Sequence, residues 1–140
     1  MRWFKLPAEG LWISPDGERL TASEHLLAIR DNPTLFGLPL AVQKMDIPDL
    51  EKVAEDLINK GWTRYRYLDG RHHFEVDDAR ARMSLIRDVL QSVNALADEE
   101  LWVSQVGGQE SQGKVKDAHD HAFLRFEGKI ENKWRFSGRA

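Results

Sequence analysis

Apolar and polar positions alternate most regularly in residues 61–78, GWTRYRYLDGRHHFEVDD, which predicts a pair of antiparallel strands. At its centre lies Asp69-Gly70, a dipeptide favoured in two-residue type I′ hairpin turns. A reversal there places on one face the residues that suit a core: Thr63, Tyr65, Tyr67, His72, Phe74 and Val76. The opposite face collects the charged and polar residues: Arg64, Arg66, Arg71, His73 and Glu75. This register therefore directs the tyrosines inward and the arginines toward solvent.

Residues 11–45 predict a shorter hairpin, a helix and a packed connector. The segment LWISPDGERLT reads as two strands around a type I turn at Ser14-Pro15-Asp16-Gly17. A helix over 22–32 follows, with Thr21 or Ser23 as its N-cap and Asn32-Pro33 as its end. Residues 33–45 form an apolar connector that we expect to pack against the core.

Two longer helices follow from apolar residues at helical spacing. In residues 47–61 these positions form one face, with Pro48 in the first turn and Gly61 just past the end. A helix over 79–97, capped by Asp77 or Asp78, carries one stripe through Met83, Ile86, Leu90, Val93 and Ala97. A second stripe beside it contains Leu85, Val89 and Leu96. A face this wide predicts contact from two sides, by the sheet and another element or by a second copy of the protein.

The remaining segments complete the expected fold class. Residues 101–106 predict a strand, and residues 107–121 are polar with three glycines, which favours a long mobile loop. Residues 122–128 and 133–137 read as closing strands. Together the elements predict a single α+β domain over 1–140, with a mostly antiparallel sheet built from hairpins and packed against two main helices.

Composition narrows the classes of protein to consider. The 140 residues contain no cysteine, which excludes disulfides, thiolate metal sites and a cysteine nucleophile. The net charge of −3 and the pI near 5.9 argue against a dedicated DNA-binding domain. No membrane-length apolar run and no signal-peptide pattern occur in the sequence, so we expect a cytoplasmic protein without membrane contact.

The strongest candidate for catalysis is a metal site in the segment DAHDHAF. His119 and His121 would project to one side of a strand, and Asp117 or Asp120 could join them. His72 or His73 could supply a further ligand. This pattern supports, as one alternative, a metal-dependent hydrolase. Ser23 and His25 cannot form a nucleophile–base pair on a helix, because residues two apart do not face each other.

A second alternative is weak binding of RNA or single-stranded DNA. It would use the hairpin arginines at 64–71 together with the basic C-terminal segment around Trp134 and Phe136. Stacking on bases needs aromatic rings beside the arginines, whereas the predicted register separates Tyr65 and Tyr67 from them. The hairpin is therefore interpreted mainly as scaffold.

Residues 11–76 resemble small proteins encoded by bacteriophages and integrated elements. The shared features are a W-x-S-P-D-G start at Trp12, a following histidine at His25, a P-x-x-F-G segment at Pro33 and a G-W-x-R-x-R strand at Gly61. The resemblance implies a viral origin, but it implies no activity and assigns no functional residue.

The preferred hypothesis is a non-enzymatic protein-interaction domain without a cofactor, serving as an accessory or inhibitory factor of a phage or mobile element. Its partner would be another protein or a second copy of the chain. We expect its contacts on the polar hairpin face and the second helix stripe: Arg64, Arg66, Arg71, His73, Leu85, Val89 and Leu96.

Overall fold

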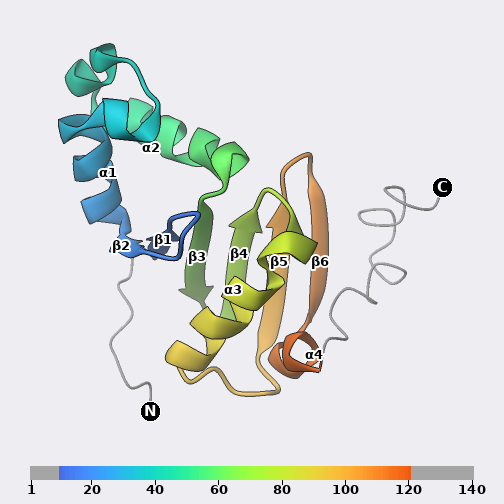
Figure 1. The fold of residues 1–140 in the computed structure, drawn as a ribbon. Helices are drawn as coiled ribbons and strands as arrows, with labels where there is room; N and C mark the ends of the chain where they lie inside the picture. Colours follow the sequence, from blue (N-terminus) through green and yellow to red (C-terminus); the bar gives the residue numbers. More distant parts are fainter. Residues whose placement is uncertain (1–9, 121–140) are drawn as a thin grey trace.

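The computed structural model describes residues 10–120, which form a six-stranded sheet with helices on both of its faces (Figure 1). The strands are β1 Leu11–Ile13, β2 Arg19–Thr21, β3 Thr63–Leu68, β4 Arg71–Val76, β5 Glu100–Gln105 and β6 Gln109–Lys114. They lie in the order β2-β1-β3-β4-β5-β6, and every neighbouring pair is antiparallel except β4 and β5, which are parallel. The α+β class with a mostly antiparallel sheet is confirmed.

Both predicted hairpins form, and the hairpin of β3 and β4 has the predicted register. Tyr65 pairs with Phe74 and Arg66 with His73 across β3 and β4. Asp69 and Gly70 both have positive φ, 50° and 77°, as a type I′ turn requires. In the first hairpin, the Gly17 N–H donates to the Ser14 carbonyl at 2.9 Å, which closes the expected turn.

One group of helices, residues 22–60, forms what we call the helical lobe. It contains α1 Ala22–Asp31, the 3₁₀ helices η1 Pro33–Phe36 and η2 Leu40–Lys44, α2 Ile47–Asp56, and the 3₁₀ helix η3 Leu57–Lys60. Thr21, rather than Ser23, caps α1 through a capping box with Glu24. The predicted helix over 47–61 is α-helical only to Asp56, and Gly61 ends η3 with a φ of 100°.

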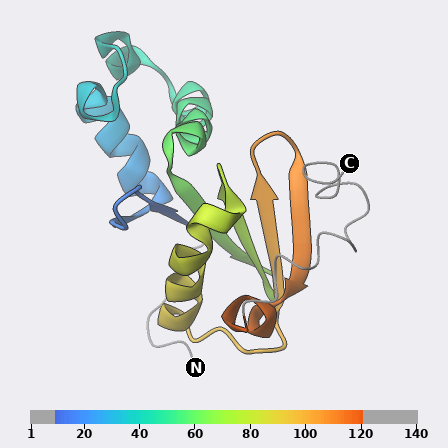
Figure 2. The ribbon, with the colours of Figure 1, turned by 45° about the vertical axis from the view of Figure 1, so that its right-hand side comes forward.

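The other helices cover the opposite face of the sheet. α3 Ala79–Ser92 begins at the N-cap Asp78 and connects the parallel strands β4 and β5, and the short α4 Val115–His119 follows β6. In Figures 1 and 2 both helices lie on one side of β4–β6, whereas the helical lobe lies beyond β1 and β3. The fold therefore has two cores.

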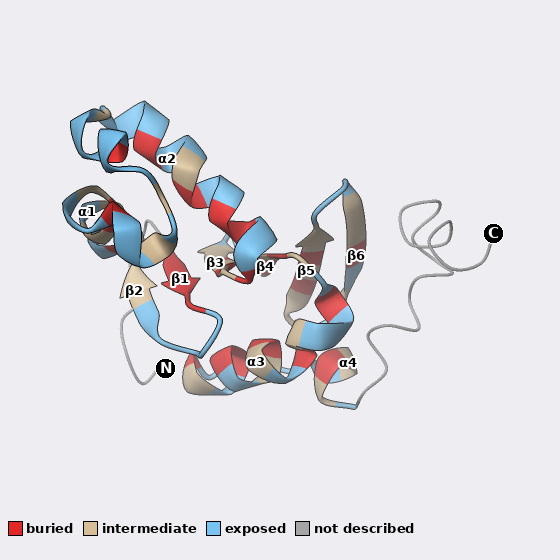
Figure 3. Cartoon of the chain, turned by 45° about the horizontal axis from the view of Figure 1, so that its top comes forward, coloured by how far each residue is buried: buried red, intermediate tan, exposed pale blue. Residues whose placement is uncertain are grey.

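The two cores use alternate residues of β1. Leu11 and Ile13 point into the core between the sheet and α3 and α4, with Tyr65, Phe74 and Val103. Trp12 points the other way, into the helical lobe. Figure 3 shows buried residues recurring along α2 and α3 between exposed and half-buried ones, as expected of helices that pack on one side.

The polar stretch predicted as a long loop over 107–121 differs from the structure. Residues 107–120 are not a long loop: a turn at 106–108 leads into β6 and then α4. β6 contains no large apolar residue from which a strand could be predicted. It pairs with β5, whose backbone N–H and C=O groups require hydrogen-bonding partners on that side. His121 and the predicted strands over 122–128 and 133–137 lie outside the described residues.

No helix within residues 10–120 has the length and apolar character needed to cross a membrane.

The helix predicted over 79–97 ends at Ser92. Val89 is fully buried and Leu85 is partly buried against the same core, which also contains Val115 and Ala118 of α4. The second stripe is therefore covered from within the chain, so Leu85 and Val89 do not form an open docking surface. Leu96 is 61% exposed, but it lies beyond the helix and does not extend that stripe.

Candidate functional site

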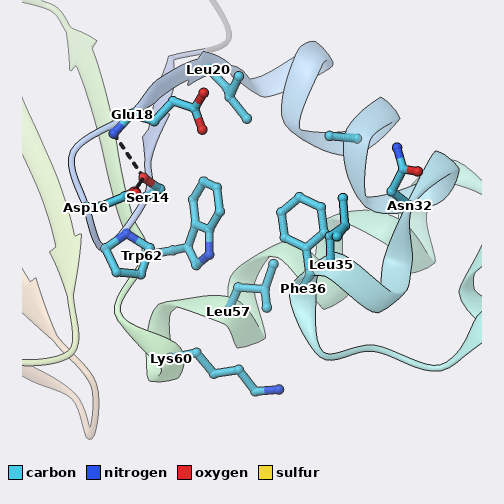
Figure 4. Close-up of a pocket in the computed structure, with 12 residues that line it drawn as sticks. Ser14, Asp16, Glu18, Leu20, Asn32, Leu35, Phe36, Leu57, Lys60 and Trp62 are labelled. Atoms are coloured by element: carbon cyan, nitrogen blue, oxygen red, sulfur yellow. Dashed lines mark hydrogen bonds between the residues drawn. The ribbon is translucent and has the colours of Figure 1, made fainter.

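A cleft of about 680 Å³ lies between the first hairpin turn and the helical lobe (Figure 4). Volumes in this range are typical of sites that hold a small molecule or a few side chains. Its apolar surface comes from Leu20, Leu35, Phe36, Leu57 and Trp62. Leu35 is 82% exposed, the highest value among the exposed large apolar side chains. The cleft therefore presents aromatic and aliphatic surface to solvent.

Opposite charges stand at the two ends of this cleft. Asp16 and Glu18 lie on the hairpin turn, and Lys60 lies at the end of η3 (Figure 4). The Ser14 hydroxyl donates to the Asp16 carboxylate and accepts from the Glu18 N–H at 2.9 Å, which holds the acidic turn in place. Neither carboxylate nor Lys60 forms an ion pair within residues 10–120. The charged groups are thus available to a ligand.

A buried histidine lies behind the aromatic wall of the cleft. The His25 ring centroid is 4.3 Å from that of Trp62, 4.7 Å from that of Trp12 and 5.9 Å from that of Phe36. His25 is fully buried, and neither ring nitrogen has a hydrogen-bond partner in the described part of the chain. Burial lowers the pKa of His25 to about 4, so the ring is neutral at pH 7. His25 acts here as an aromatic packing group, and it cannot pair with Ser23 as a catalytic base.

The position of Trp62 depends on the glycine before it. Gly61 has a φ of 100°, and a Cβ atom there would lie 2.8 Å from Arg82 Nη2 and 3.2 Å from Pro15 Cγ. The close approach brings the turn at Pro15 next to the start of β3. The hairpin turn and Trp62 therefore form adjacent parts of the same cleft wall.

The arginines predicted as contact residues do lie on one face of the sheet. Side chains of β3–β6 that point away from α3 form what we call the open sheet face: Arg64, Arg66, Leu68, Arg71, His73, Glu75, Glu100, Trp102, Ser104, Glu110, Gln112 and Lys114. Arg64 Nη1 lies 3.4 Å from Glu75 and 3.6 Å from Glu55, and Arg66 Nη2 lies 3.6 Å from Glu75. These arginines are thus partly neutralised by neighbouring carboxylates.

Trp102, which the sequence did not single out, joins this face from β5. Its ring centroid is 5.8 Å from that of His73, and Arg71 Cζ lies 5.7 Å from the Trp102 ring. Arg71 Nε is 3.3 Å from Glu100, and the indole N–H of Trp102 donates to the same carboxylate at 3.0 Å. Burial, followed by the charges of Arg66 and Arg71, lowers the pKa of His73, which favours a neutral ring. An aromatic pair therefore lies among the predicted arginines.

On the opposite face, a polar network crosses the core. His72 is fully buried: its Nδ1 is 2.9 Å from the Tyr65 hydroxyl and its Nε2 is 2.9 Å from Glu99. The Tyr67 hydroxyl and the Leu96 N–H also donate to the Glu99 carboxylate, each at 2.9 Å. Burial raises the pKa of Glu99, but the bonds from His72, Leu96 and Tyr67 outweigh it and lower the pKa to about 2. The network anchors the segment that precedes β5.

Two residues of the predicted metal site, His119 and Asp120, lie within the described part of the chain, and neither is on a strand. His119 is the last residue of α4 and Asp120 is its C-cap, so the expected strand geometry is absent. His72 is occupied by Glu99 and Tyr65, and His73 belongs to the open sheet face. Residues 10–120 contain no group of three or more side chains arranged to hold a metal ion. His121 lies outside the described residues.

Neither site could be read fully from the sequence. The sequence showed Trp62 and Phe36 only as members of two short motifs. It did not predict that they line one cleft, because these motifs are far apart in the chain. Trp102 lies in a strand without strict alternation, so its face depends on the parallel pairing with β4. The one local signal was the position of Trp102 between the apolar residues Leu101 and Val103, because neighbouring residues of a strand point to opposite faces.

Comparison with protein-family models, curated proteins and solved structures found no match. Function must therefore be argued from geometry. Three of the short motifs noted in the sequence, at 12–17, 33–37 and 61–66, gather around the cleft. The turn at 14–17, Phe36 and Trp62 contribute to its wall, and His25 and Trp12 pack behind them.

Proposed function

We propose that this protein is a protein-interaction domain that binds an extended segment of a partner protein in the cleft of its helical lobe. The observation that carries the proposal is an apolar, aromatic cleft with charges of opposite sign at its ends that form no ion pair within residues 10–120. Contacts of aromatic and aliphatic side chains dominate the energy of protein interfaces, and charged groups at their rims set orientation.

The charges suggest how the partner segment is oriented. A basic side chain near Asp16 and Glu18 would complement the acidic end, and an acidic side chain would complement Lys60. An apolar side chain between them would contact Trp62, Phe36 and Leu35. The occupant we favour is therefore a peptide segment with a basic residue, an apolar residue and an acidic residue in that spatial order.

The distribution of exposed apolar residues supports this location. Within residues 10–120, seven large apolar side chains are exposed, and four of them belong to the helical lobe: Leu27, Leu35, Leu40 and Ile47. Exposed apolar groups near a cleft are a usual feature of protein-binding surfaces. This lobe replaces the α3 stripe as the proposed contact surface. The resemblance to phage proteins is consistent with a cytoplasmic accessory or inhibitory factor that acts by binding.

Selection of short peptides from a random display library on the purified protein tests the proposal. We expect enriched peptides to combine an apolar residue with a basic one and to bind the cleft. Leu35→Ala should weaken their binding by about fivefold to tenfold, since roughly 1 kcal/mol of apolar contact is lost. Leu96→Ala is the matched control, because Leu96 is an exposed leucine that lies outside the helical lobe and does not line the cleft.

Charge variants sharpen this experiment. Lys60→Gln should weaken the binding of peptides that carry an acidic residue. Lys52→Gln, on the exposed side of α2, should leave their binding unchanged. The proposal is wrong if no peptide is enriched, or if enriched peptides bind the Leu35→Ala variant as tightly as the unmodified protein.

A further inference from the structure

The open sheet face offers a second binding site, distinct from the cleft. α3 and α4 pack on the other side of the sheet, and the helical lobe covers only the end near β1 through Trp12. On β4–β6, side chains on the open face are half-buried or exposed. A hollow of about 300 Å³ lies beside Trp102, lined also by Glu100, Gln112, Gly113, Lys114 and Asp117.

We propose that the open sheet face binds the unpaired bases of single-stranded nucleic acid, with Trp102 as the main stacking surface. Single strands are bound by aromatic rings that stack on bases and by cations that contact phosphates. Both kinds of group occur here within contact distance: the Trp102 and His73 rings at 5.8 Å, and the Arg71 guanidinium 5.7 Å from the Trp102 ring.

The hydrogen-bonding groups around the hollow suit the edge of a base. The Gln112 amide can donate and accept, Glu100 and Asp117 can accept from amino groups, and Lys114 can contact a phosphate. The indole N–H of Trp102 is already bonded to Glu100 at 3.0 Å, which fixes the ring in one orientation. A fixed ring lowers the entropic cost of stacking.

The side chains of this face suit a nucleic-acid strand better than a protein partner. Four cationic side chains, Arg64, Arg66, Arg71 and Lys114, lie among five carboxylates: Glu75, Glu100 and Glu110 on the strands, Glu55 beside Arg64, and Asp117 at the hollow. Phosphates can replace these carboxylates as partners of the arginines. Besides the half-buried Trp102, Leu68 is the exposed large apolar residue of this face within residues 10–120, so a protein partner would find little aliphatic surface to bury.

Fluorescence anisotropy with labelled single-stranded RNA and DNA tests this inference. We expect affinity to decrease with salt and Trp102→Ala to weaken binding by about tenfold, whereas Trp102→Phe should retain most of it. Arg71→Gln should weaken binding, while Arg80→Gln, an equal change of charge on exposed α3 surface, should have no effect. Glu75→Gln should strengthen binding by about twofold to fivefold because it releases Arg64 and Arg66, and Glu51→Gln on α2 should not.

Four outcomes would overturn the inference: no binding of any single strand, equal binding by the Trp102→Ala variant, equal affinity for duplexes, or equal affinity for free mononucleotides. The last would indicate a nucleotide site instead of a strand site. Leu35→Ala should leave nucleic-acid binding unchanged, so failure here and failure of the peptide-binding proposal can be told apart.

Discussion

The His25 and Trp62 rings lie with their centroids 4.3 Å apart, and Trp62 lines the cleft whereas His25 does not. One tryptophan thus serves both as cleft wall and as cover for a buried, neutral imidazole. Because neither His25 nitrogen has a hydrogen-bond partner within residues 10–120, protonation of this ring inside the fold is costly. The packing behind the cleft is therefore sensitive to acid.

This sensitivity should appear in the pH dependence of stability. The pKa of His25 falls from 6.5 to about 4 on folding, so the unfolded chain binds more protons between these values. Stability should be complete above about pH 6.5 and decline as pH falls toward 4, by at most about 3 kcal/mol. Urea unfolding across this range should show the decline, and His25→Phe should reduce it. His119→Gln, at the end of α4, is the control; an unchanged pH profile for His25→Phe would contradict this origin.

Glu99 should affect the stability of the protein in a lower pH range than His25 does. Its pKa falls from 4.5 to about 2 on folding, so its contribution is complete above about pH 4.5 and is lost as pH falls through 2. Glu99→Gln should cost about 2–3 kcal/mol at neutral pH, because the charged acceptor of His72, Tyr67 and Leu96 is removed. Chemical denaturation measures the loss. The neighbouring exposed change Asp98→Asn should have little effect, and equal effects of the two changes would contradict the proposed network.

Two glycines with the same backbone conformation should respond differently to alanine. Gly10 and Gly108 have φ values of 90° and 89°. A Cβ at Gly10 would lie 2.6 Å from the Tyr65 carbonyl oxygen, whereas a Cβ at Gly108 meets no atom within 4 Å. We expect Gly108→Ala to cost about 1 kcal/mol and Gly10→Ala about 3 kcal/mol or more. Thermal unfolding of both variants provides the comparison, and similar losses would be inconsistent with this close contact.

The covered stripe of α3 leads to a further comparison. Val89 is completely buried, whereas Leu96 is 61% exposed. Val89→Ala should destabilise the protein by about 1–3 kcal/mol, and Leu96→Ala should change stability by less than about 0.5 kcal/mol. Denaturant unfolding distinguishes them. A stable Val89→Ala variant with altered self-association would instead restore α3 as a contact surface.

Features set by neighbouring residues could be predicted from the sequence. The Asp69-Gly70 turn, the alternation of β3 and β4, the Thr21 cap and the Gly61 helix end all depend on interactions within a few residues. The inward tyrosines and outward arginines followed directly from that register. β6 could not be predicted in this way, because its polar sequence forms a strand only when β5 supplies the hydrogen-bonding neighbour.

Contacts between distant segments decided which neighbour each helix or strand face packs against. The sequence indicated that α3 is apolar on two sides, but only the tertiary structure showed that Leu85 and Val89 share a core with Val115 and Ala118 of α4. The parallel pairing of β4 and β5 placed Trp102 beside His73, and the folding of the lobe placed Trp62 opposite Leu35. By itself, the sequence determined the faces of individual elements, because side-chain direction follows from local backbone periodicity. Which faces are covered, and which remain open for binding, depends on contacts between residues distant in the chain.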